Sequence, residues 1–197
     1  MDNRLRILFM LIAFIVASQG CKKDDSSTVS PPPPANSFSF SCSNYAFAAS
    51  GPFVANATSG SGVGILDERT IAAYCFTSPT NGSIAMLRFS SADSIAVRSY
   101  LFPTGAAFGW ALNTNVNDTA ALNSAMCVTM SGTLVVTSFT ATSISGTFSG
   151  TGCSVRNPTH TYSFANGAFT VSRTIVPFFR VTGAMKPLAK RMLDVAP

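Results

Sequence analysis

The sequence predicts an all-β protein, in which a single antiparallel β-sandwich or barrel-like domain follows a flexible N-terminal stalk. Short segments alternate between apolar and small polar residues, and turn-forming pairs such as Asn81-Gly82 and Asn166-Gly167 separate them. No stretch between residues 36 and 176 shows a helical period. Hydrophobic residues make up 47% of the chain and charged residues only 11%, a composition that favours a packed core over disorder.

Residues 1–20 are predicted to be a lipoprotein signal peptide. Arg4 and Arg6 precede an apolar run over residues 7–17, which is too short to cross a membrane because a spanning helix needs about 20 residues. The small residues before Cys21 resemble a lipobox, in which the cysteine after the cleavage site carries the lipid. The alternative is an ordinary secretory signal that leaves Cys21 as a plain thiol.

Residues 21–36 are predicted to be the lipidated cysteine and a Pro-rich linker. The run from Lys22 to Asp25 resembles the start of mature lipoproteins in Bacteroidota, where it implies transport to the outer leaflet; a plain polar spacer is the alternative. The prolines at 31–34 favour an extended polyproline II stalk. We therefore expect an outer membrane lipoprotein of the bacterial cell envelope, exposed at the cell surface, with the membrane as partner through its lipid anchor.

Residues 37–176 are predicted to form the β-domain. Phe38, Phe40 and Cys42 alternate with serines, as in a strand with one buried face. Further strands are expected over residues 71–77, 83–89, 94–102, 129–139, 143–149 and from 162 to 171.

The pair Asn81-Gly82 is expected to be a two-residue hairpin turn, because both residues tolerate a positive φ. This register places Cys75 and Arg88 on one face of the hairpin. It places four large side chains on the other, apolar face: Phe76 opposite Leu87, and Tyr74 opposite Phe89.

Two segments carry a resemblance to a family. The stretches at 134–151 (LVVTSFTATSISGTFSGT) and 162–171 (YSFANGAFTV) resemble uncharacterised β-rich surface lipoproteins of Bacteroidota, which have an ISGTFSG-type strand and an NGxF closing strand. The resemblance covers residues 38–173. It implies an all-β domain and no particular activity. Cys75, Cys127, Cys153 and the tail after Arg173 lie outside that pattern.

Four cysteines remain after Cys21, and an even number in an exported chain predicts two disulfides with three possible connectivities. Pairing Phe139 near Ile144 in the second hairpin brings Cys127 close to Cys153, which leaves Cys42 for Cys75. The alternative is four buried thiols. A zinc site is disfavoured because the chain has no C-x₂-C spacing and one histidine. We expect no metal and no cofactor.

No catalytic residues are predicted, and the protein is not expected to be an enzyme. His160 is the only histidine and lies in a loop, and the chain has no G-x-S-x-G elbow or phosphate-binding loop. Asp67 and Glu68 are adjacent in a turn, where charged residues are common. An atypical hydrolase is the second alternative, and it would need His160 beside a serine or a carboxylate in a cleft.

The net charge of +5 is unevenly distributed. Four arginines balance four acidic residues between residues 36 and 172, whereas the segment from Arg173 is basic. A nucleic-acid-binding domain would carry its positive charge on the fold itself, so no nucleic acid is expected as a partner. Residues 177–197 are predicted to be a basic C-terminal tail, disordered or forming a short helix.

The function that the sequence favours is a non-catalytic binding or structural role at the cell envelope, with a glycan or a protein as ligand. The first alternative is a carbohydrate-binding accessory lipoprotein of a glycan-uptake system, with Trp110 as a ligand-stacking residue; packing of Trp110 in the core competes with it. Ser94 and Thr119 each follow an aspartate in a pattern that resembles O-glycosylation acceptors of Bacteroidota. The oligomeric state is not indicated.

Overall fold

The computed structural model describes residues 36–54, 59–90 and 94–176, and in these ranges it confirms the all-β class. Ten antiparallel strands form one sheet in the order β2-β1-β10-β9-β8-β7-β5-β4-β3, and β6 pairs with β8. The elements are β1 (Ser37–Cys42), β2 (Tyr45–Ser50), β3 (Gly60–Asp67), β4 (Thr70–Phe76), β5 (Asn81–Phe89), β6 (Ser99–Phe102), β7 (Ala106–Asn115), α2 (Thr119–Ala125), β8 (Met126–Phe139), β9 (Ser143–Ser154) and β10 (Thr161–Ser172).

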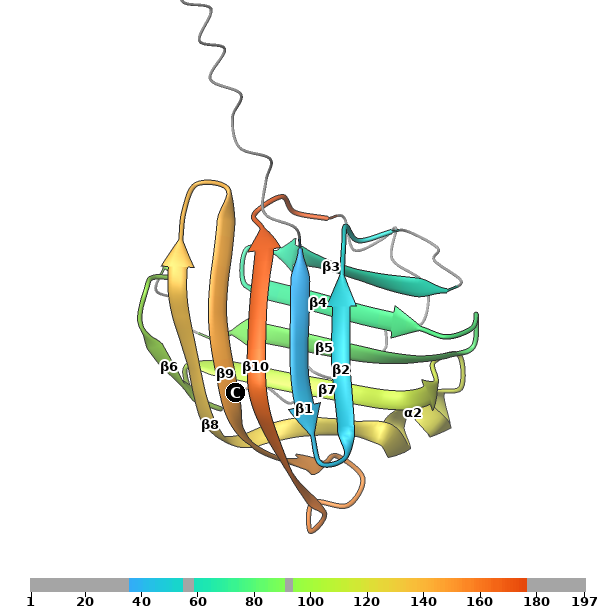
Figure 1. Ribbon diagram of the computed structural model, residues 1–197. Coiled ribbons are helices and arrows are strands. Elements are labelled where there is room, and N and C mark those ends of the chain that lie inside the picture. The colour runs from blue at the N-terminus through green and yellow to red at the C-terminus, as the bar shows by residue number, and fades with distance from the viewer. Residues whose placement is uncertain (1–35, 55–58, 91–93, 177–197) are drawn as a thin grey trace, which may run out of the picture. The chain divides into compact units, whose positions relative to one another are not determined.

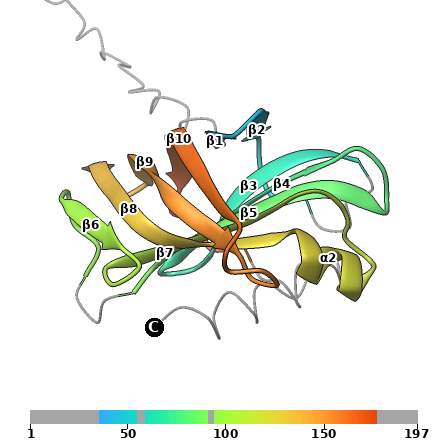
Figure 2. The same cartoon turned by 90° about the horizontal axis from the view of Figure 1, so that it is seen from below.

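The sheet coils on itself until it is a nearly closed barrel. Strands β1, β2, β9 and β10 form one layer, and β3, β4, β5 and β7 cross behind them at a steep angle (Figures 1 and 2). The two end strands of the sheet, β2 and β3, approach each other near Val63. The Val63 backbone N–H donates to the Gly51 carbonyl at 3.0 Å, and Pro52 forms an isolated β-bridge with Val63. Near closure leaves little exposed strand edge.

Strand β8 joins the two layers. Its first residues pair with β7, residues 132–135 pair with β6, and β9 follows it along its length. The β8–β9 pairing shifts between Thr129 and Ser131 and again between Val136 and Ser138, and such bulges bend a strand and increase its twist. Gly132 lies beside the first shift with φ +136, where a Cβ would strike the Ser149 carbonyl oxygen.

The barrel interior is filled by aromatic rings. Phe108 on β7 is at the centre, with its ring centroid 4.8 Å from Phe148, 5.0 Å from Trp110 and 5.1 Å from Phe164. Phe38 and Phe40 from β1 complete its contacts. These rings come from both layers, so their packing holds the layers together.

A second apolar cluster lies on the other face of β4, β5 and β7. Tyr74, Ile84 and Met86 belong to it, and Leu122 of α2 packs against it. Strands β4 and β5 are therefore buried on both faces, which explains their continuous apolar sequence.

The predicted register of the β4–β5 hairpin is wrong. Phe76 pairs with Gly82 and Tyr74 pairs with Ile84, so residues 77–80 form the loop and Asn81 begins β5. Tyr74 and Phe76 consequently lie on the face opposite Leu87 and Phe89, which point into the barrel, and Cys75 and Arg88 lie on different faces. Because both faces are buried, apolar alternation could not fix the pairing.

Other sequence expectations are partly corrected. Residues 94–98 lie outside any strand, and β2, β3 and β7 were not predicted. The short helix α2 was not predicted either, and it forms where the Asp118 carboxylate accepts hydrogen bonds from the backbone N–H groups of Ala120 and Ala121. A helix of two turns is too short to show a period.

The predicted signal peptide, nearly all of the linker and the basic tail lie outside the described residues.

In the ranges that the structure describes, no helix combines the length and the apolar character that a membrane crossing requires.

Phe108→Ala is expected to lower the free energy of unfolding by about 3–5 kcal/mol, because it removes the ring at the centre of the barrel core. Denaturant unfolding followed by circular dichroism measures this. Leu101→Ala is the control, since Leu101 is 64% exposed and the change should stay within about 0.5 kcal/mol. Equal losses in the two variants would contradict the aromatic core.

Candidate ligand-binding site

The described domain has cavities at its two ends, on either side of the aromatic core. A cavity of about 360 Å³, here called the mouth pocket, lies where the β3–β4 turn approaches the β8–β9 turn. A cavity of about 400 Å³, here called the thiol pocket, lies beside the β1–β2 turn. Strand β10 connects them, since Tyr162 lines the thiol pocket and Arg173, just past the end of the strand, lines the mouth pocket.

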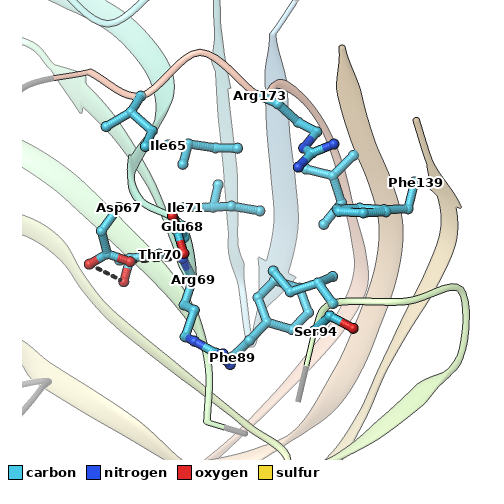
Figure 3. A pocket seen from close by; sticks show the side chains of 13 residues that line it. Ile65, Asp67, Glu68, Arg69, Thr70, Ile71, Phe89, Ser94, Phe139 and Arg173 are labelled. Carbon is cyan, nitrogen blue, oxygen red and sulfur yellow. Dashed lines mark hydrogen bonds between the residues drawn. The ribbon is translucent and has the colours of Figure 1, made fainter. Parts of the chain in front are cut away.

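The floor of the mouth pocket is apolar. Ile65 and Ile71 are direct partners in the β3–β4 pairing, and Phe139 and Ile144 are direct partners in the β8–β9 pairing. Phe89 at the end of β5 also lines the pocket (Figure 3). Two hairpins from different layers therefore bring apolar side chains together at one end of the barrel.

The β3–β4 turn forms one side of the rim. Asp67 is held by this turn, because its carboxylate accepts from the Arg69 backbone N–H at 2.8 Å and from the Thr70 hydroxyl at 3.0 Å (Figure 3). The Arg69 carbonyl accepts from the Phe89 N–H at 2.9 Å, which fixes the turn against the floor. Asp67 thus has a structural role in shaping the rim.

Arg173 forms the other side of the rim. Its guanidinium carbon lies 4.3 Å from the centre of the Phe139 ring, and its Nη1 donates to the Thr140 carbonyl at 2.7 Å. The Arg173 backbone N–H also donates to the Thr142 carbonyl at 2.9 Å. A guanidinium has five donors in a planar fork, so these contacts orient the group and leave donors for a ligand.

An apolar floor beside an oriented guanidinium suits an amphipathic molecule. Its apolar part would contact the isoleucines and phenylalanines, and an acidic group would accept hydrogen bonds from Arg173. Glu68 lies on the same rim, and its negative charge would favour a ligand with one acidic group over one with several.

The thiol pocket contains Cys42 and Cys127, both buried, beside Trp110. Burial, with Cys42 and Cys153 nearby, raises the pKa of Cys127 to about 12. Burial also raises the pKa of Cys42, which hydrogen bonds with Ser43 and Trp110 partly offset. Both groups therefore remain protonated thiols at neutral pH, and a protonated thiol is a poor nucleophile and metal ligand.

The predicted disulfides are not found, since Cys42, Cys75, Cys127 and Cys153 are free thiols. The hairpin register was predicted well, because Phe139 does pair with Ile144. The bulges then shift the pairing so that Cys127 faces Ser154 and Cys153 faces Val128. Neighbouring residues on a strand point to opposite faces, so the two thiols lie on opposite sides of the sheet. Cys75 lies on β4, outside the thiol pocket that contains Cys42.

Trp110 is not a ligand-stacking residue, and that prediction is wrong. Only 2% of its surface is exposed, and its ring stacks on Phe108 at a centroid distance of 5.0 Å. Phe164 and Phe40 contact it edge-on. A sugar ring needs an open aromatic face, so the carbohydrate-binding hypothesis loses the residue on which it depended.

The other sequence candidates lie apart from one another. His160 is exposed between β9 and β10, and in the described part of the chain its ring makes no hydrogen bond to a serine or a carboxylate. Ser94 and Thr119 are exposed, so both stay predictions as acceptors. Thr119 follows the Asp118 that caps α2. Among the described residues, no group of three His, Cys, Asp or Glu side chains could hold a metal ion.

Comparison with known proteins adds no assignment, because no family model, no curated protein and no solved structure matches the chain.

Alkylation with iodoacetamide at pH 8 is expected to modify Cys75 and Cys153 before Cys127, because a thiol with a raised pKa holds its proton and does not attack. Peptide mass spectrometry at successive times gives the rate at each site. In urea the thiols of Cys42, Cys75, Cys127 and Cys153 should react at similar rates. If native Cys127 reacted as fast as Cys153, the buried thiol pocket would be ruled out.

Proposed function

We propose that the chain is an exported lipoprotein whose β-domain binds small amphipathic molecules at the mouth pocket without changing them chemically. The observation that carries the proposal is the arrangement of Ile65, Ile71 and Phe139 beside the oriented guanidinium of Arg173. The cavity of about 360 Å³ falls within the range of roughly 300–1,000 Å³ that small-molecule sites occupy.

The anchoring part of the proposal rests on sequence. Arg4, Arg6, the apolar run and Cys21 support lipidation, and the lysines and aspartates that follow support an outer membrane position. Lipid chains on Cys21 would provide stable attachment, since each buried CH₂ contributes about 0.8 kcal/mol. The prolines at 31–34 would extend the chain between the lipid and the domain.

A binding role without catalysis is supported by the places of the ionisable groups. Asp67 shapes the β3–β4 turn, and Asp118 caps α2. His160 lies in the β9–β10 connection, whereas the mouth pocket is formed at the β8–β9 turn. General acid–base chemistry needs such groups within hydrogen-bond reach of one reacting atom, and these are spread over different elements.

Arg173→Gln is expected to weaken binding of anilinonaphthalene sulfonate about 10-fold, since one charge-assisted hydrogen bond contributes roughly 1.5 kcal/mol. N-phenylnaphthylamine has the same ring system without the acidic group, so its affinity should change less than about twofold. Fluorescence titration measures both affinities.

Arg156→Gln is the matched control, because Arg156 donates to Ser124 at 2.7 Å and does not line the mouth pocket. It should leave both affinities unchanged. Equal effects of Arg173→Gln on the two probes, or none on either, would refute recognition of an acidic group by Arg173.

Cys21→Ser is expected to move the protein from the membrane fraction to the soluble fraction of a bacterial host that processes lipoproteins. Mass spectrometry of the mature wild-type chain should find an acylated N-terminal cysteine. Cys75→Ser is the control and should remain membrane-bound, since Cys75 lies on β4. An unmodified thiol at Cys21 would show that no lipid anchor forms there.

A further inference from the structure

The walls of the mouth pocket are mainly aliphatic. Five of the residues that line it are isoleucines: Ile65, Ile71, Ile95, Ile144 and Ile175. They come from β3, β4, the β5–β6 connection, β9 and the segment that follows β10, so branched side chains face the cavity from several sides. A flexible alkyl chain can follow such an uneven surface, because it changes shape by rotation about its single bonds.

The two phenylalanines of the pocket are already engaged in ring contacts. Phe89 is 1% exposed, and its ring meets that of Tyr100 edge-on with centroids 5.2 Å apart. Phe139 is half-buried, and the guanidinium carbon of Arg173 lies 4.3 Å from the centre of its ring. A planar ligand that stacks needs an open aromatic face. The pocket therefore favours an aliphatic tail over an aromatic one.

The charge of the pocket is at its rim and the aliphatic surface lies deeper. Ile71 and Ile144 are each 2% exposed, whereas Arg173 is exposed. Ile175, 51% exposed, forms an isolated β-bridge with Ile65 and so continues the apolar surface up to the rim. A ligand that enters tail first keeps its acidic group in water beside Arg173, which avoids the cost of burying a charge.

The size of the cavity limits the length of the tail. A methylene group is about as large as a water molecule, whose share of liquid volume is roughly 30 Å³, so a cavity of about 360 Å³ holds about twelve such groups. Decanoate has about that many non-hydrogen atoms. A lipid with two long acyl chains is too large.

We propose that the mouth pocket binds the free anion of a straight-chain aliphatic acid of about ten carbons, with its tail among the isoleucines and its carboxylate at Arg173. This inference rests on the proposed function and specifies the ligand class of the same site. Burial of the chain provides the affinity, and Arg173 determines which end stays in water.

The first test is isothermal titration calorimetry of the full chain with Cys21→Ser, so that no acyl chain of its own competes. Hexanoate, octanoate and decanoate are titrated at pH 8, below their micelle-forming concentrations. Affinity should rise about tenfold for every two methylenes, because each buried methylene adds to binding. The comparison ligand is 2-naphthoate, a rigid aromatic acid of similar size, which should bind more weakly than decanoate.

The outcomes separate this inference from the proposed function. If 2-naphthoate bound as tightly as decanoate, or if the three aliphatic acids bound equally well, the aliphatic class would be overturned and the proposed function would stand. If none of the four acids bound, both would be overturned.

Decanedioate tests the orientation of the ligand. It has the same chain length as decanoate and a second carboxylate at the far end, which would have to enter the aliphatic part of the pocket. Its affinity should be lower by about 100-fold or more, because an unpaired charge is costly to bury. Equal affinities of the two acids would overturn the tail-first orientation.

Ile95→Phe tests the length limit, since Ile95 is half-buried, lines the pocket and lies outside any strand. The larger side chain should weaken decanoate binding about tenfold and change hexanoate binding less than about twofold, because a shortened cavity still holds the shorter chain. Val97→Phe is the matched control in the same connection, since Val97 is 60% exposed and does not line the pocket. It should leave both affinities unchanged. Equal losses for the two acids in Ile95→Phe, or no loss for either, would overturn the proposal.

Discussion

The packing of aromatic rings between the two crossing layers is the constraint on which the rest of this structure depends. Phe108 and Trp110 from β7 meet Phe38 and Phe40 from β1 and Phe148 from β9, so rings from both layers fill the space that the coiled sheet encloses. The rings are tightly packed against the backbone at Gly152, because a Cβ at that position would lie 2.6 Å from the Trp110 ring. The mouth pocket and the thiol pocket lie at the two ends of this filled interior, and the floor of the mouth pocket continues the core.

The sequence was most informative where one face of a strand is buried and the other is exposed to solvent. The alternation of Phe38 and Phe40 with serines located β1, and the turn between Phe139 and Ile144 gave the correct pairing of β8 with β9. Where both faces are buried, as in β4 and β5, alternation is lost and the register was misjudged. Strand β3 is rich in glycine, so its sequence shows no apolar alternation that would predict a strand.

The candidate site was missed for a different reason. Ile71, Phe139 and Arg173 are ordinary residues in the sequence, and only the pairing of distant strands brings them to one end of the barrel. Arg173 looked like the first charge of a basic tail, whereas its contacts with Phe139 and Thr140 make it part of the β8–β9 turn. Trp110, whose aromatic ring was predicted to stack on a ligand, is a core residue. An aromatic side chain suits core packing as well as ligand stacking, and only the fold decides between the two.

Because Trp110 is the only tryptophan, its fluorescence reports on the centre of the barrel without labelling. Acrylamide quenching of the native protein tests most directly whether aromatic rings fill the interior. The account predicts a blue-shifted emission maximum and a quenching constant at least several-fold below that of the urea-unfolded chain. An emission maximum and a quenching constant equal to those of the unfolded chain would contradict it.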